Sequence, residues 1–225
     1  MTADRPWIQP GDRAPSFVLP AINREGMVSL EDYRGRTPLL LGLYRGLHCP
    51  FCRRQIVQLG ATQEKLKAVG VETLIVINTP VERARLYFRH RPARMLLAAD
   101  AEAATHRAYG APAFVPVEDP SAARWPWRAT MAQFQANLIN PTGELPEPRN
   151  GFEANEALNR MDGFELTEVD KQIFSAHGSQ LVGHFLIDRQ GIVRWVHVEA
   201  GASMADIGRF PSEDELLAAA RALPS

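Results

Sequence analysis

The sequence of 225 residues has few cysteines, no long apolar run and almost no net charge. Its two cysteines cannot form the disulfide framework of a small secreted module. Its longest apolar run, PLLLGLY at 38–44, is far shorter than the roughly 20 residues that span a bilayer. The formal net charge of -1 does not favour nucleic acid or an anionic membrane as a partner.

The N-terminal residues, MTADRPWIQPGDRAPSF, lack the basic-then-apolar pattern of a signal peptide. We therefore expect a cytoplasmic protein whose thiols are normally reduced. In that compartment a closely spaced cysteine pair is more often redox-active or metal-binding than structural.

In the first half of the chain, continuous apolar runs alternate with stretches whose apolar residues recur at helical spacing. Buried strands are expected at 37–44, 71–78 and 95–100, and helices at about 50–70, from Pro80 and at 101–110. Near the C-terminus, LVGHFLID and GIVRWVHVE predict a hairpin, and Ser212 with Glu215 predicts a capped final helix. This order indicates an α/β fold in one domain, 1–225, with a mostly parallel sheet and an antiparallel hairpin at its edge.

An insertion at 111–180 interrupts this alternation. It begins rich in proline and then offers helices near 128–139, 153–161 and 167–176. It is too apolar for a disordered linker, because it contains the aromatic residues Phe114, Trp125, Trp127, Phe134, Phe164 and Phe174. We expect a folded segment that serves as a lid, as a contact in a homodimer or other oligomer, or as further packing on the same core.

Both cysteines lie in the sequence CPFC at 49–52, where the first buried strand gives way to a helix. Because Pro50 suits a first helical turn, Cys49 is expected at the N-cap or just before it. Unpaired amide groups and the positive end of the helix dipole stabilise a thiolate there. Nearby positive charge from Arg45, Arg53 and Arg54 adds to this effect, so the pattern predicts a reactive cysteine.

The spacing of three residues places the two thiols one helical turn apart, within reach of a disulfide. Cys49, Cys52, Ile56 and Leu59 share one helical stripe, so we expect Cys52 to be buried and Cys49 to be the more exposed thiol. An exposed nucleophile with a sheltered resolving partner makes a working dithiol–disulfide couple.

Three neighbours of the pair, Tyr44, Arg45 and His48, are candidates to bind substrate or to tune the acidity of the thiols. For each of them, packing or turn geometry is an equally good explanation. An inert core pair is a weaker alternative. Zinc requires four ligands, and the six histidines are scattered, although His184 and His197 could face each other across the hairpin. We therefore expect no metal and no other cofactor.

Three stretches of the sequence are similar to one family: GDRAPSFVLP, SLEDYRGRTPLLLGLYRGLHCPFC and FLIDRQGIVRW. They resemble the alkyl hydroperoxide reductase / thiol-specific antioxidant branch, the peroxiredoxin-like branch of the thioredoxin-like fold. The resemblance covers roughly 10–110 and 181–223. It implies an antioxidant oxidoreductase that reduces small hydroperoxides or disulfides with electrons from thioredoxin, glutaredoxin or glutathione.

The resemblance leaves the identity of the attacking thiol open. The peroxiredoxin motif T-x-x-C aligns its nucleophile with Cys52, whereas thioredoxins attack with the first cysteine, here Cys49. Exposure and the helix dipole favour Cys49. The chain also has Val182 or a neighbour where peroxiredoxins carry an arginine, which makes Arg45 a candidate replacement. A proline that thioredoxin-like proteins place before the same strand is absent.

The sequence thus favours a thiol-dependent oxidoreductase in which Cys49 attacks the substrate and Cys52 closes a disulfide. The alternative, from another class, is a non-enzymatic redox sensor or interaction protein that uses the aromatic insertion to bind a partner.

Overall fold

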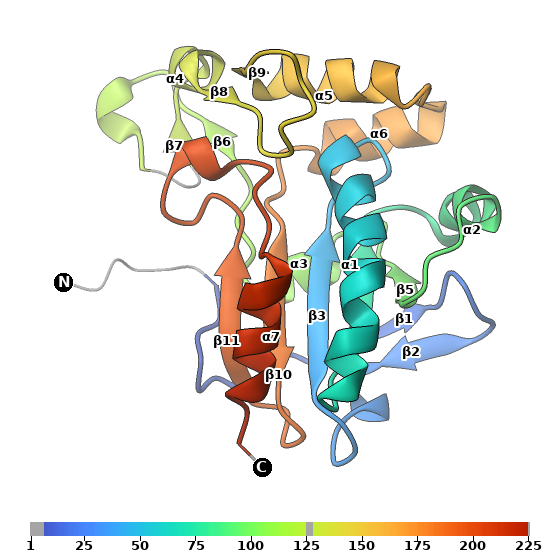
Figure 1. Ribbon diagram of the computed structural model, residues 1–225. Coiled ribbons are helices and arrows are strands. Elements are labelled where there is room, and N and C mark those ends of the chain that lie inside the picture. The colour runs from blue at the N-terminus through green and yellow to red at the C-terminus, as the bar shows by residue number, and fades with distance from the viewer. Residues whose placement is uncertain (1–6, 125–127, 225) are drawn as a thin grey trace.

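A computed structural model describes residues 7–124 and 128–224. Its centre is a five-stranded sheet in the order β11-β10-β3-β4-β5 (Figure 1). Three strands run parallel, namely β3 (Leu39–Tyr44), β4 (Glu72–Ile77) and β5 (Leu96–Ala99). The hairpin of β10 (Gly183–Ile187) and β11 (Val193–Val198) adds antiparallel to β3, as predicted. His184 and His197 are paired in its register.

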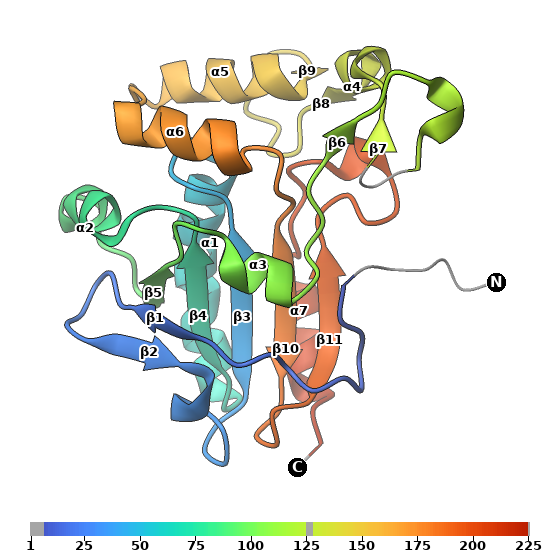
Figure 2. The same ribbon diagram turned by 180° about the vertical axis from the view of Figure 1, so that it is seen from behind.

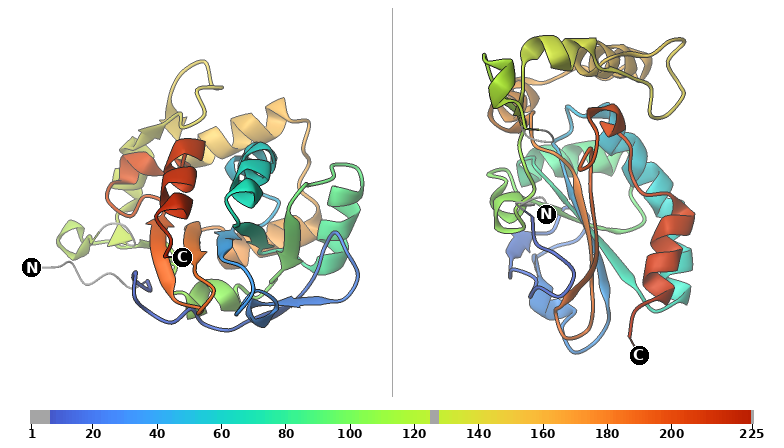
Figure 3. Two further views of the ribbon diagram at one scale, coloured as in Figure 1. Left: turned by 60° about the horizontal axis from the view of Figure 1, so that its bottom comes forward. Right: turned by 90° about the vertical axis from the view of Figure 1, so that its left-hand side faces the viewer.

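Helices cover one face of the sheet, and a mixed layer covers the other (Figures 2 and 3). The first layer holds α1 (Pro50–Ala68), α2 (Val81–Arg89) and α7 (Glu213–Arg221), which pack on Leu40, Ile75 and Leu186. The second layer holds β1 (Val18–Pro20), β2 (Met27–Ser29), the turn η1 (Leu30–Asp32) and α3 (Ala104–Ala108). Alternate side chains of the same strands, such as Leu41 and Phe185, pack on that side.

Local sequence signals account for the ends of these elements. The last helix begins where Ser212 and Glu215 form the predicted capping box. The first helix begins at Pro50, and the chain leaves it through Gly70, whose φ of 80 suits glycine. Over 7–124 and 128–224, no helix is both long enough and apolar enough to cross a membrane.

The segment 111–180 lies above the edge of the sheet where β3 and β4 end (Figure 1). Its larger helices are α5 (Gly151–Met161) and α6 (Glu168–His177), close to the predicted bounds. It also holds β6 (Val115–Pro116), η2 (Pro120–Ala122), β7 (Arg128–Ala129), α4 (Met131–Ala136), β8 (Leu138–Ile139) and β9 (Arg149–Asn150).

The prediction of one helix over 128–139 was wrong. Thr130 caps a helix that ends at Ala136, because Leu138 and Ile139 pair with β9 instead. Trp125 and Trp127 lie outside the described residues. The assignment of 111–180 as an insertion within one domain stays a prediction.

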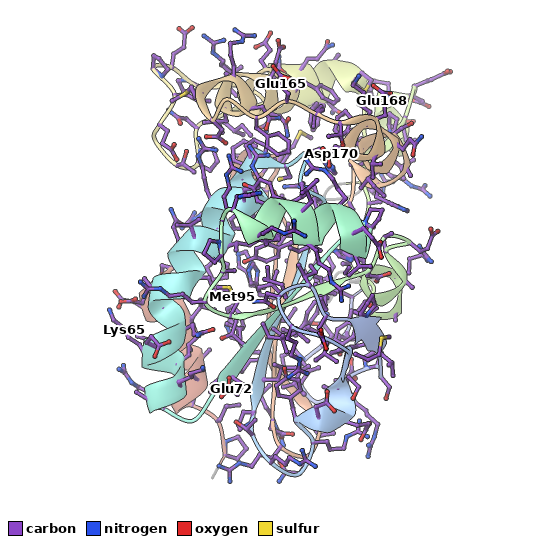
Figure 4. The ribbon with its side chains drawn as sticks, turned by 90° about the vertical axis from the view of Figure 1, so that its right-hand side faces the viewer. Lys65, Glu72, Met95, Glu165, Glu168 and Asp170 are labelled. Carbon is purple, nitrogen blue, oxygen red and sulfur yellow. The ribbon has the colours of Figure 1, made fainter. Side chains whose placement is uncertain are left out.

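Buried polar contacts attach this segment to the helices below it. Arg53 of α1 donates from Nη2 to Asn159 Oδ1 at 2.8 Å and to Asp162 Oδ2 at 2.7 Å. Asp170 of α6 lies toward α2, where it pairs with Arg83 at 2.7 Å (Figure 4). Charge-assisted hydrogen bonds of this kind are the stronger ones in proteins, so the segment is firmly placed over the start of α1.

The loop from β3 to α1 passes so close to β4 that it requires a glycine. A Cβ atom on Gly46 would lie 2.5 Å from the backbone oxygen of Asn78 and 2.8 Å from Ile173 Cγ2. A backbone oxygen cannot move aside cheaply, so Gly46 sets the path of the residues that follow it.

We predict that Gly46→Ala lowers the free energy of unfolding by about 1–3 kcal/mol, the usual cost of overpacking. The matched control is Gly60→Ala, inside α1, where a new Cβ would meet nothing closer than 3.9 Å. That change should stabilise the protein by about 0.5–1 kcal/mol, the helix preference of alanine over glycine. Urea unfolding of both variants checks the pair, and equal effects would contradict the close approach.

Candidate active site

The carboxyl end of β3 and the first turn of α1 place Cys49. The residue is the N-cap of α1, as predicted, with φ of -89 and ψ of 106. Its sulfur accepts a hydrogen bond from the backbone N–H of Cys52 at 3.3 Å. The N-cap position thus supplies one amide hydrogen bond and the positive end of the helix to this sulfur.

Arg45 is the second group that holds the sulfur. Its Nε donates to Cys49 Sγ at 3.3 Å. Its other nitrogens are occupied, since Nη2 pairs with Glu199 Oε1 at 2.7 Å and Nη1 donates to the backbone oxygen of Gln180 at 3.2 Å. The guanidinium therefore bridges the cysteine loop and the segment that leads into β10, close to the Val182 position.

Glu199, at the end of β11, fixes this arginine. Its side chain is fully buried, and it also accepts hydrogen bonds from the backbone N–H groups of Val182 at 3.0 Å and Gly208 at 2.6 Å. A buried carboxylate with this many donors is satisfied, so the ion pair with Arg45 has one defined geometry.

These contacts set the ionisation of the two thiols in opposite directions. Burial alone raises the pKa of Cys49, but the hydrogen bond from the Cys52 thiol and the charge of Arg45 outweigh it and lower the pKa to about 6. Burial and the hydrogen bond with Cys49 raise the pKa of Cys52 well above its ordinary value. At neutral pH the pair therefore holds one thiolate, on Cys49, and one thiol, on Cys52.

Two expectations about this environment were wrong. Cys49 and Cys52 are each 1% exposed, so Cys49 is no more open to solvent than its partner, because the segment 111–180 covers the start of α1. Arg53 and Arg54 do not direct their charge at Cys49. Arg53 pairs with Asp162, and Arg54 pairs with Asp162 and Glu144.

Tyr44 and His48 lie on different sides of the pair. The hydroxyl of Tyr44 is hydrogen-bonded with His184 Nε2 at 2.9 Å inside the core, so the structure does not bring Tyr44 into the cavity described next. His48 lines that cavity and packs on Phe174, with ring centroids 5.1 Å apart. Burial and the charge of Arg45 lower the pKa of His48 to about 3, so its imidazole is neutral.

A cavity of about 900 Å³ reaches Cys49 from the side of the segment 111–180. Arg45, His48 and Phe51 line its floor, and most of its walls come from that segment. The cavity is within the range of pockets that bind small organic molecules. Among the described residues, no group of three or more His, Cys, Asp or Glu is arranged to hold a metal ion.

Sequence reasoning missed Glu199 and Gln180, the two residues that hold Arg45. Glu199 directly follows the apolar run of the last strand. A glutamate in such a buried region normally pairs with a cation, so it could have indicated a buried arginine or lysine nearby. The sequence does not identify Arg45 as the arginine that pairs with Glu199, because the two residues are 154 positions apart. Gln180 acts through its backbone oxygen, which leaves no signal in the side chain.

The fold is shared with solved redox proteins. A 2-Cys peroxiredoxin of Plasmodium vivax, in its reduced form, aligns with a TM-score of 0.57 and 17% identity over 94% of this chain and 80% of its own. Peroxidoxin BcpB of Mycobacterium tuberculosis aligns with a TM-score of 0.57 and 16% identity over 97% and 99%. A protein assigned as the thiol:disulfide interchange protein DsbE of Chlorobium tepidum aligns with a TM-score of 0.50 and 20% identity over 95% and 99%.

At these identities the likeness establishes the fold, which is thioredoxin-like, as predicted. No curated protein sequence matches the chain. The model of the AhpC/TSA family matches residues 10–143, and so extends into the segment predicted to be an insertion. Family and fold together support a redox enzyme of the peroxiredoxin type in general. Because the match spans more than half of the sequence, this chain belongs to the AhpC/TSA family.

Proposed function

We propose that this protein is a thiol peroxidase that reduces hydroperoxides by cycling Cys49 and Cys52 between dithiol and disulfide. The observation that carries the proposal is the hydrogen bond from Arg45 Nε to Cys49 Sγ at the floor of a cavity. It combines an ionised sulfur with a fixed cation and an opening that a small molecule can enter.

In the first step the Cys49 thiolate attacks the terminal oxygen of the hydroperoxide, forming an S–O bond while the O–O bond breaks. The sulfur loses two electrons and becomes a sulfenic acid, and the leaving oxygen takes up a proton to form the alcohol, or water when the substrate is hydrogen peroxide. Arg45 is placed to stabilise the charge that moves from sulfur to oxygen.

In the second step Cys52 attacks the Cys49 sulfenic acid. An S–S bond forms, the S–O bond breaks, and water leaves. An external thiol then donates two electrons to restore both thiols, and thioredoxin, glutaredoxin and glutathione are the proposed classes of reductant. The proposed assembly is a homodimer.

Burial favours a hydroperoxide over a protein disulfide as the oxidising substrate. Cys49 and Cys52 are each 1% exposed, so another protein cannot reach Cys49 without displacing the covering segment. Reaction with a protein disulfide requires that displacement, as does re-reduction by thioredoxin or glutaredoxin. A hydroperoxide needs only the cavity. We assign Arg45 and His48, which line it, to the substrate, and Tyr44 to the support of the pair from within the core.

The first prediction separates the roles of the two thiols. In Cys52→Ser, one equivalent of hydroperoxide should convert Cys49 to a sulfenic acid that dimedone traps, and turnover should stop. In Cys49→Ser, neither adduct nor peroxide loss should appear, because burial, the largest cause of the raised pKa of Cys52, persists and keeps this thiol protonated. Mass spectrometry of both variants is the measurement, and a dimedone adduct on Cys52 of Cys49→Ser would assign the attack to the other thiol.

The second prediction concerns pH. Because only the thiolate reacts, alkylation of Cys49 by iodoacetamide should rise with pH, reach half its maximum near pH 6 and level off above pH 7. Arg45→Met removes the cation, so the midpoint should move up by about 1–3 pH units. Arg45→Lys is the matched control, since it keeps a positive charge. A midpoint that is the same in wild type and Arg45→Met would contradict the role of the arginine.

The third prediction concerns Glu199, the carboxylate that pairs with Arg45. Glu199 raises the pKa of Cys49 through its negative charge, so Glu199→Gln should move the alkylation midpoint below that of the wild type. The same change leaves Arg45 buried without its partner and should cost about 3–5 kcal/mol of unfolding free energy. Urea unfolding and the alkylation profile check the two effects, and an upward midpoint would contradict the charge argument.

The alternative function, a redox sensor that binds a partner through its aromatic segment, makes a different prediction about turnover. A sensor would be oxidised stoichiometrically and would not consume further hydroperoxide with any thiol reductant present. Peroxide loss followed over many equivalents, in the presence of each class of reductant, separates the two functions.

A further inference from the structure

The cavity over Cys49 is far larger than hydrogen peroxide requires. Two oxygen atoms occupy a volume on the order of 60 Å³, about that of two water molecules in the liquid. The cavity measures about 900 Å³. Apolar space of this size next to a reactive sulfur indicates a substrate with a large body attached to its peroxide group.

The walls of the cavity are rich in aromatic rings. Three of these rings form a cluster around Phe134, whose ring centroid lies 5.1 Å from that of Phe114 and 4.9 Å from that of Phe152. Phe51, Phe164 and Phe174 add further rings to the lining. Phe152 is 49% exposed and Phe174 is 38% exposed, although side chains of this size are normally covered. Exposed apolar groups gathered at one cavity are typical of a ligand site.

One residue of the cavity floor, His48, has unused hydrogen-bonding capacity. His48 is 1% exposed and lines the cavity, yet neither ring nitrogen has a hydrogen-bond partner among the described residues. Buried polar atoms are almost always paired, so we infer that the His48 imidazole forms a hydrogen bond with a polar group of a ligand. The cavity therefore has a polar end, at His48 and Arg45, and an aromatic body.

This arrangement assigns a substrate class, on the premise of the proposed peroxidase function. We propose that the segment 111–180 makes the enzyme selective for hydroperoxides that carry a bulky apolar group, over hydrogen peroxide. The peroxide oxygens lie between Cys49, Arg45 and His48, and the aryl or long alkyl group lies on Phe134 and Phe152. Phe152 is thus a specificity-determining residue contributed by this segment.

The kinetic test compares cumene hydroperoxide with hydrogen peroxide, using the same reductant for both. For the wild type we expect kcat/KM to favour cumene hydroperoxide by about 100-fold, the effect of burying one aryl group. Phe152→Ala should lower that ratio about tenfold. Leu138→Ala is the matched control, because Leu138 belongs to the same segment, is 59% exposed and lies outside the cavity lining. Its ratio should equal that of the wild type.

A second variant tests the same point by filling the space instead of opening it. Ser175 lines the cavity and is exposed to solvent, so Ser175→Trp adds a ring without disturbing the core. It should also lower the ratio, in this case by obstructing the larger substrate. A wild-type ratio near one, unchanged in Phe152→Ala and Ser175→Trp, would overturn the proposed selectivity while leaving the peroxidase function intact.

A binding measurement separates the two proposals when activity is absent. Calorimetry of Cys49→Ser with 2-phenyl-2-propanol, the alcohol product of cumene hydroperoxide, should show one site that Phe152→Ala weakens about tenfold. Binding without any peroxide loss by the wild type would mean that the cavity is an apolar site and the peroxidase function is wrong. No binding would overturn the apolar site itself.

Discussion

The candidate site depends on one buried ion pair, Arg45 with Glu199. Arg45 keeps its charge beneath the covering segment, and without a partner this buried cation would cost much of the stability of the fold. Glu199 stabilises the buried guanidinium by accepting a hydrogen bond from its Nη2, and the Nε of Arg45 then donates to Cys49. The pair also joins three separate parts of the chain, the loop after β3, the lead into β10 and the end of β11. One interaction therefore both tunes the ionisation of the Cys49 thiol and joins the loop after β3 to the ends of the β10–β11 hairpin.

The second constraint is the cover that the segment 111–180 provides. It contacts the cysteine helix through Arg53 and Asn159, and Asn159 Nδ2 also donates to the backbone oxygen of His48 at 3.2 Å. These contacts shield the sulfur from bulk water, which strengthens the effect of Arg45 on it. They also decide what can approach the sulfur. The electrostatics of the thiolate and the choice of substrate are consequently two results of the same packing.

Much of the arrangement could be read from local patterns in the sequence. Cys49 at the N-cap, Pro50 in the first turn and Cys52 one turn later need only the rules of helix termini, and the structure has each of them in place. The mixed sheet and the capped last helix likewise follow from short-range periodicity. The helix at 128–139 was overestimated, because pairing between Leu138 and Asn150 outweighed local helix preference.

The chemistry available follows from the residue types alone: two thiols at disulfide spacing, beside an arginine, at the start of a helix. Which positive charge reaches the sulfur depends on long-range contacts. Arg45, Arg53 and Arg54 are equally near in sequence, but Arg45 alone hydrogen-bonds to Cys49, since Asp162 and Glu144 take the others. Exposure was decided in the same way, because the segment over the start of α1 is held there by contacts such as Arg53 with Asn159, 106 positions apart in sequence. Local patterns fix the position of Cys49 on its helix, and long-range contacts fix its burial and the positive charge beside it.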